Sequence, residues 1–153
     1  MMRQKKDMNI IIIGATSGIG YGLLKKYAVP GNTIGILGRR KSILKELERR
    51  YPSKVITCAA DISRQEEMSK AVRYFQSQIQ TIDIVILCSG IGELNPSLDF
   101  NIEYPTLLTN VVGWTYAIDA FYNIINHQGF EHLVTITSIG GLRGEPQAPA
   151  YSA

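Results

Sequence analysis

Five short apolar runs, rich in β-branched residues, recur along the chain with polar or mixed stretches between them. Because the runs are nearly continuous rather than alternating, they are typical of parallel strands that are buried on both faces. The predicted strands are residues 9–13, 33–37, 55–59, 82–87 and 132–137.

The stretches between these strands have the composition and length of helices. The predicted helices are residues 18–28, 41–51, 64–79 and 105–127, and residues 90–104 form the one long irregular connection. Ser63 is expected to cap the third helix, with Glu66 completing a capping box. The alternation of strand and helix predicts an α/β fold with an open, doubly wound parallel sheet, in a single domain over residues 1–153.

Composition narrows the class of protein. A chain of 153 residues with 45% hydrophobic and 19% charged residues is an ordinary globular sequence that buries a sizeable core. Eleven of the sixteen Lys and Arg residues lie within residues 1–50. This basic N-terminal third either attracts phosphates or is a solvated helix surface. The basic residues have no aromatic residues interleaved with them, so no nucleic-acid partner is expected.

The apolar residues also bear on location. The run at residues 10–13 is too short to span a membrane and no small-residue cleavage site follows it, so no membrane association is expected. Cys58 and Cys88 lie in separate apolar runs and have no metal-ligand spacing. Two thiols expected to be buried fit a reducing cytoplasm, and no metal site is expected.

A glycine-rich turn joins the first strand to the first helix, with the sequence Gly14-Ala15-Thr16-Ser17-Gly18-Ile19-Gly20. Its first glycine permits a sharp turn, its second lets a pyrophosphate approach backbone N–H groups, and its third lets the helix pack closely on the strand. Glycines that serve packing alone are the alternative. The order of strand, loop and helix favours a dinucleotide loop instead.

The Gly-x-x-x-Gly-x-Gly spacing resembles the cofactor loop of the short-chain dehydrogenase/reductase family. The resemblance implies a Rossmann-type doubly wound sheet and hydride transfer between a nicotinamide cofactor and a small-molecule carbonyl or alcohol substrate. It also implies a set of cofactor-binding residues, which are Gly14, Thr16, Ser17, Gly18, Ile19, Gly20, Arg39, Arg40, Asp61, Ile62, Ser89 and Gly90.

The end of the second strand bears on the choice of cofactor. An NAD site usually has an acidic residue about 20 residues past the loop, but here the strand ends in Gly38-Arg39-Arg40. This predicts NADP(H) over NAD(H), with Arg39 binding the 2′-phosphate and Arg40 stacking on adenine. The alternative is that both arginines begin the next helix in solvent. Asp61 matches the family residue that meets the adenine amino group, or else it caps the turn that follows.

The fourth strand departs from the family pattern. Leu87-Cys88-Ser89-Gly90 stands where the family usually has Asn-Asn-Ala-Gly, and only the glycine is kept. The missing asparagines are expected to remove side-chain hydrogen bonds that tie this strand to its neighbours. Cys88 is expected to be a small buried hydrophobic residue.

Three residues of the second half match the family's catalytic positions: Asn110, Ser138 and Tyr151. The resemblance implies that Tyr151 is the general acid of reduction and the base of oxidation. Ser138 would hydrogen-bond the substrate oxygen, and Asn110 would hold a water through its backbone. A structural asparagine facing solvent is the alternative for Asn110.

Tyr151-Ser152-Ala153 resembles the start of the family's Tyr-x-x-x-Lys motif, whose lysine would be residue 155. We therefore expect the N-terminal portion of the family fold, incomplete on its C-terminal side. We also expect little turnover from these 153 residues, because bringing a tyrosine pKa from about 10 toward about 7 needs a neighbouring ammonium group.

The helix at 105–127 is apolar nearly all round and is expected to be buried on two sides, in a homo-oligomer or by further chain. Two other functions share the predicted topology. One is a non-catalytic dinucleotide-binding or regulatory protein. The other is an S-adenosylmethionine methyltransferase, which would usually carry an acidic residue where Arg39 stands.

Overall fold

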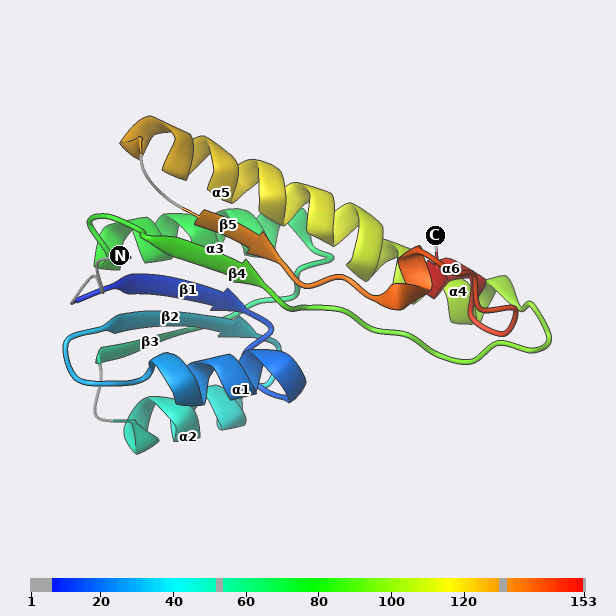
Figure 1. The fold of residues 1–153 in the computed structure, drawn as a ribbon, viewed down its shortest axis with the longest axis horizontal. Coiled ribbons are helices and arrows are strands. Elements are labelled where there is room, and N and C mark those ends of the chain that lie inside the picture. The colour runs from blue at the N-terminus through cyan, green and yellow to red at the C-terminus, as the bar shows by residue number, and fades with distance from the viewer. Residues whose placement is uncertain (1–6, 52–53, 130–131, 153) are drawn as a thin grey trace.

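Five parallel strands form a central sheet in the computed structural model, which describes residues 7–51, 54–129 and 132–152. The order across the sheet is β3-β2-β1-β4-β5, and every neighbouring pair is parallel (Figure 1). This confirms the predicted Rossmann-type, doubly wound fold. The strands are β1 Asn9–Ile13, β2 Thr33–Gly38, β3 Lys54–Ala59, β4 Ile84–Leu87 and β5 His132–Thr135.

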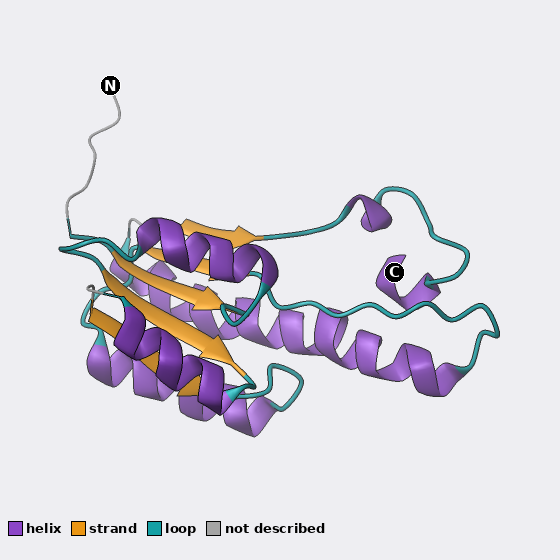
Figure 2. Cartoon of the chain, turned by 90° about the horizontal axis from the view of Figure 1, so that it is seen from below, coloured by secondary structure: helices purple, strands orange, loops and turns teal. Residues whose placement is uncertain are grey.

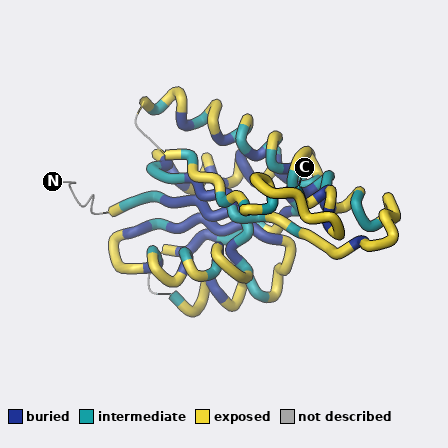
Figure 3. The backbone as a smooth tube through the Cα atoms, turned by 45° about the vertical axis from the view of Figure 1, so that its right-hand side comes forward, coloured by how far each residue is buried: buried dark blue, intermediate teal, exposed yellow. Residues whose placement is uncertain are grey.

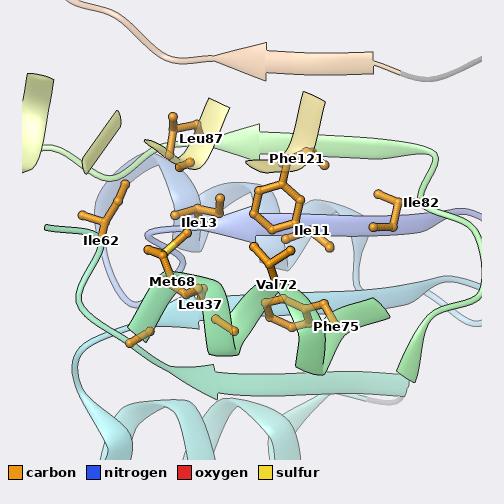
Figure 4. Packing of buried hydrophobic residues seen from close by; sticks show 14 of the residues in the cluster. Ile11, Ile13, Leu37, Ile62, Met68, Val72, Phe75, Ile82, Leu87 and Phe121 are labelled. Atoms are coloured by element: carbon orange, nitrogen blue, oxygen red, sulfur yellow. The ribbon is translucent and has the colours of Figure 1, made fainter. Parts of the chain in front are cut away.

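Helices cover both faces of the sheet. On one face, α1 (Gly18–Tyr27) and α2 (Lys41–Arg50) bury Leu24, Leu44 and Leu47 against the strands. On the other face, α3 (Gln65–Gln78) and α5 (Trp114–Gln128) pack Phe75 and Phe121 over β1 (Figure 4). The side chains of β1 alternate between the two clusters, so this strand is buried on both faces as its apolar run predicts.

The start of α3 differs from the predicted capping box. Arg64 is the N-cap residue and its side chain makes no capping bond. The Ser63 hydroxyl donates instead to Asp61 Oδ1 at 2.7 Å, and Glu67 accepts from the Asp61 N–H at 2.8 Å. The predicted cap at Ser63 with Glu66 is therefore wrong, because the local turn made by Asp61 engages the hydroxyl first.

The fourth predicted helix begins earlier and is interrupted. It consists of α4 (Phe100–Leu107), a π-helical turn η1 (Leu108–Gly113) and α5. Asp99 is the N-cap of α4 and accepts from the Asn101 N–H at 2.9 Å. Pro105, which suggested a helix start, lies inside α4. Part of the predicted irregular connection is thus helical.

Residues 91–107 and 138–152, here called the arm, extend beyond the carboxyl ends of the strands (Figures 1 and 2). The arm contains the connection after β4, α4, a 3-10 turn η2 (Ile139–Gly141) and the short helix α6 (Pro149–Ser152), which packs against α4. Much of its surface is exposed (Figure 3). The only buried residues of the arm within the described ranges are Asn95, Thr106, Ala148 and Ala150.

Helix α5 buries one face. Ala117, Phe121 and Ile125 lie against the sheet, whereas Tyr122 is 53% exposed on the opposite side. The predicted burial on two sides is therefore not present in the single chain. Among the described residues, no helix is long and apolar enough to cross a membrane.

Candidate functional site

A cleft of about 520 Å³ lies at the carboxyl ends of β1, β2 and β4. Its volume falls within the roughly 300–1,000 Å³ of typical ligand pockets, and its place is where open parallel sheets bind ligands. All of the predicted cofactor-binding residues line it except Gly20. Sequence reasoning missed several further lining residues, of which most stand at strand ends: Leu37, Gly38, Ala60, Cys88, Ile91 and Thr109.

The glycine loop has the geometry that its sequence predicts. Gly14 and Gly18 have φ angles of 90° and 53°, which L side chains rarely adopt. A Cβ on Gly20 would lie 2.3 Å from the Gly14 carbonyl oxygen, so this glycine serves the packing of α1 on the loop. The first N–H groups of α1 have no acceptor within the helix and open space lies beside Gly18, so the residues present fit a dinucleotide pyrophosphate.

Both arginines after β2 line the cleft, and they make different contacts. Arg40 Nη2 donates to Thr16 Oγ1 and to Ser17 Oγ, each at 2.8 Å. Arg39 Nη1 lies 3.7 Å from Asp61 Oδ2. Neither guanidinium is simply solvated, and Arg40 is the one that reaches the glycine loop.

Asp61 organises the turn after β3. Its Oδ1 accepts from the Ser63 N–H at 3.0 Å and from the Ser63 hydroxyl, so Asp61 caps the turn that follows, which was the alternative to contact with adenine. Partial burial raises the pKa of Asp61, but the two Ser63 hydrogen bonds and the nearby Arg39 outweigh it and leave the pKa below its usual value. The carboxylate is therefore held ionised at the rim of the cleft.

The segment after the fourth strand keeps side-chain hydrogen bonds to its neighbours, although the family's asparagines are absent from it. The Trp114 indole N–H donates to the Ser89 carbonyl at 2.6 Å. Asn110 accepts from the Ile91 N–H at 2.9 Å and donates to the Ile91 carbonyl at 2.7 Å. Asn110 is thus not a solvent-facing asparagine. It lies in the π-helical turn, a feature that is frequent at functional sites.

The structure brings Ser138 and Tyr151 together around Gly140. Ser138 Oγ accepts from the Gly140 N–H at 3.1 Å. A Cβ on Gly140 would meet the Tyr151 ring at 3.2 Å, and one on Gly92 would meet the other side of that ring at 2.6 Å. Gly92 follows Ile91, the residue that Asn110 holds. Asn110 is thus linked to Tyr151 only through the backbone of Ile91 and Gly92, and sequence reasoning missed Gly92 and Gly140.

The two cysteines differ from their prediction. Burial raises the pKa of both thiols, yet each side chain is only half-buried. Cys88 packs against the core and also lines the cleft. It is partly covered because it is the first residue beyond the end of β4.

Comparison with known proteins gives consistent matches. A family model described as short chain dehydrogenase matches residues 8–153. An uncharacterized oxidoreductase of Mycobacterium tuberculosis is 32% identical over 151 residues, which cover 94% of this chain and 60% of that protein. A 3-oxoacyl-[acyl-carrier-protein] reductase of Chlamydia muridarum is 29% identical with the same coverage of both chains. The chain thus spans about 60% of the length of these relatives.

The fold has close counterparts among solved structures. That of an NAD⁺-bound xylitol dehydrogenase superposes with a TM-score of 0.90 at 20% identity, covering 98% of this chain and 60% of the other. At this identity the likeness concerns the fold alone.

Proposed function

The chain belongs to the short-chain dehydrogenase family, and on that premise we propose that its whole protein is an NADP(H)-dependent carbonyl reductase or alcohol dehydrogenase. The observation that carries the proposal is the approach of Ser138 and Tyr151 around Gly140, in a chain whose cleft is lined by a glycine loop that fits a dinucleotide. Two relatives carry oxidoreductase or reductase names, and that supports the reaction class.

The bound cofactor supplies or accepts the hydride, and the residues of this chain hold and protonate the substrate. Tyr151 donates a proton to the carbonyl oxygen during reduction and removes it during oxidation. Ser138 donates a hydrogen bond to the same oxygen as charge develops there. The side chain of Asn110 is engaged with Ile91, which leaves its backbone for the proposed water.

The preference for NADP(H) rests on the two arginines. Arg40 is already hydrogen-bonded to the loop hydroxyls, and Arg39 lies beside Asp61 across the cleft. Planar guanidinium groups bind phosphate oxygens in pairs, and no carboxylate stands at the end of β2 to favour NAD(H). We propose that both contact the 2′-phosphate, with Arg39 the main ligand and Arg40 also stacking on adenine.

The cofactor proposal is tested by fluorescence titration of the whole protein with NADPH and NADH. NADPH is expected to bind at least about tenfold more tightly, since one charge-assisted hydrogen bond contributes about 1.5–3 kcal/mol. Arg39→Ala should weaken NADPH and spare NADH, whereas Arg40→Ala should weaken both cofactors and NADPH the more, because both carry the adenine. Lys41→Ala on the exposed start of α2 is the control. Equal affinity for the two cofactors would overturn the preference.

Two further features belong to the proposal. The 153 residues alone are proposed to turn over substrate slowly or not at all, because the family's lysine would be residue 155.

We also propose a cytoplasmic homo-oligomer that covers the exposed face of α5 around Tyr122, together with Val111 and Val112 of η1. Sedimentation of the whole protein tests the oligomer, which Tyr122→Glu is expected to dissociate.

A further inference from the structure

Asn95 is a fully buried polar side chain that joins three segments of the arm. Its backbone N–H donates to the Gln147 carbonyl at 2.6 Å, in the connection before α6. Its Oδ1 accepts from the Asp99 N–H at 2.9 Å, and its Nδ2 donates to Glu103 Oε1 at 2.6 Å. One side chain therefore ties the connection after β4 to the first turn of α4, while its backbone reaches the segment before α6.

Glu103 carries this connection onward to the helix that holds Tyr151. Its Oε2 accepts from the Ala150 N–H at 2.7 Å, across 47 residues of sequence. Ala150 is the second residue of α6, where the N–H groups have no acceptor within the helix. A carboxylate at that end accepts a hydrogen bond from this N–H group and interacts favourably with the positive end of the helix dipole. The residue next to Tyr151 is thus anchored to α4 by a charged hydrogen bond.

The ring of Tyr151 makes contacts of its own, apart from the hydrogen bond that anchors the neighbouring backbone. Gly92 and Gly140 lie on either side of it, so close that a Cβ on either glycine would press on the ring. Gly92 stands three residues before Asn95, in the same connection. The network around Asn95 therefore holds the backbone beside Tyr151, and the connection that contains Asn95 also supplies one wall of the ring.

Apolar side chains contribute little to holding α6 in place. The only apolar residues of the arm that are buried, among those described, are Ala148 and Ala150, whose side chains are single methyl groups. Leu142, on the way to α6, is 90% exposed. Among the described residues, directed hydrogen bonds are therefore the main contacts that hold α6, and those of Asn95 and Glu103 are partly buried.

We propose that Glu103, held in place by Asn95, is a positioning residue for Tyr151, which sets the phenol where it exchanges a proton with the substrate. The inference rests on the proposed function and adds a carboxylate that never touches cofactor or substrate. The dinucleotide cleft does not include Glu103 or Asn95. Loss of the network should therefore lower kcat and leave NADPH binding unchanged.

The test uses the whole protein, NADPH and 4-nitrobenzaldehyde as the carbonyl probe. Glu103→Ala is expected to lower kcat at least about tenfold, because small misplacements of a catalytic group cost large factors in rate. The Kd for NADPH should stay within about twofold. Glu103→Gln keeps one acceptor where two are needed, so its kcat should lie between wild type and Glu103→Ala.

A donor and acceptor exchange separates positioning from general damage. In the double variant Asn95→Asp with Glu103→Gln, the new carboxylate accepts from the new amide and the Gln carbonyl remains for Ala150. The Asp99 carbonyl loses its donor, Asn95 Nδ2 at 2.9 Å, so the exchange restores only part of the network. This variant should regain part of the kcat lost in Glu103→Gln alone. Glu93→Gln removes the same charge from an exposed residue of the same connection and should leave kcat within about twofold.

The outcomes are distinct. If Glu103→Ala and Glu103→Gln retain wild-type kcat, or if their kcat falls only together with NADPH affinity, the positioning role is wrong. If wild type binds NADPH but reduces neither 4-nitrobenzaldehyde nor 2,3-butanedione, the proposed function itself fails. Retained reduction in Tyr151→Phe would also exclude the catalytic role that Glu103 is inferred to support.

Discussion

The sheet and the arm are held together in different ways. Around β1 the structure is a stack of apolar side chains, and Ile10, Ile11, Ile12 and Ile13 are completely buried. In the arm, the one completely buried side chain is the amide of Asn95, within the part of the chain that the structure describes. The sheet carries the cleft proposed to bind the cofactor, and the arm carries Tyr151.

The difference shows how stability and geometry are divided in this molecule. Apolar burial is roughly proportional to area and has no direction, so it tolerates small shifts while contributing most of the stability. Hydrogen bonds contribute less but fix distance and angle. A group proposed to transfer a proton, as Tyr151 is, needs fixed geometry more than it needs a large core, and the polar network beside Tyr151 is consistent with this proposal.

The largest effect is expected in the sheet region. Phe121→Ala removes a completely buried ring between α5 and β1 and should lower the free energy of unfolding by about 3–5 kcal/mol. Urea denaturation measures the loss. Tyr122→Ala changes the neighbouring exposed ring and should cost much less. Equal losses would contradict the assignment of the stabilising core to this face of α5.

The sheet was also the more predictable region. Continuous β-branched runs give the strands of β1 and β2 to within one residue, because burial on both faces leaves no polar positions. The turn around Asp61 was less predictable, since Asp, Ser and Glu within six residues allow several capping schemes that only the backbone geometry decides. The start of α4 was also mispredicted. Proline is common at the first position of a helix, but Pro105 lies inside α4, about one turn after the helix begins.

The site was predictable where a motif names its residues and not where contact is made across the fold. Within the glycine loop all residues but Ala15 and Gly20 line the cleft, and so do Arg39 and Arg40. Gly92 could not be found, because its role depends on the Tyr151 ring 59 positions away. Glu103 likewise looks like an ordinary first-turn acid of a helix until its partner Ala150 is known.

Asn95→Ala tests the polar network directly and should cost about 1–3 kcal/mol, because it leaves the groups around a buried amide unpaired. The loss should be local: hydrogen exchange is expected to quicken at Ala150 and Tyr151 while the amides of β1 stay protected. Asn123→Ala, at an exposed asparagine of α5, is the matched control. Uniformly faster exchange through the sheet would show that the arm and sheet unfold as one unit.

Gly92→Ala should act on activity more than on stability. The added methyl group would lie 2.6 Å from Tyr151 Cδ2, so the ring must move while the core is untouched. Reduction of 4-nitrobenzaldehyde by the whole protein is expected to fall about tenfold, equal to about 1.4 kcal/mol in barrier. Gly141→Ala is the control, since its Cβ would meet open space. Similar rates for the two variants would remove Gly92 from the walls of the tyrosine site.

The smallest effect concerns acid stability at the rim of the cleft. The pKa of Asp61 is lowered in the folded protein, after the opposing effect of burial, by hydrogen bonds from Ser63 and by Arg39. A carboxyl group with a lowered folded pKa adds stability above its unfolded pKa of about 3.9 and loses it as the pH falls through the folded value. Because the group is partly exposed, the contribution is only a few tenths of a kcal/mol.

Urea denaturation of wild type and Asp61→Asn at pH 6 and pH 3 measures this contribution. Wild type should be the more stable protein at pH 6. The difference should narrow at pH 3, because below an unfolded pKa of about 3.9 the unfolded chain binds a proton that folding must release. Arg39→Ala removes one cause of the lowered pKa and should shrink the difference at pH 6. A difference that grows toward low pH would mean that the charge of Asp61 destabilises the fold, and that its turn with Ser63 depends on hydrogen bonding alone.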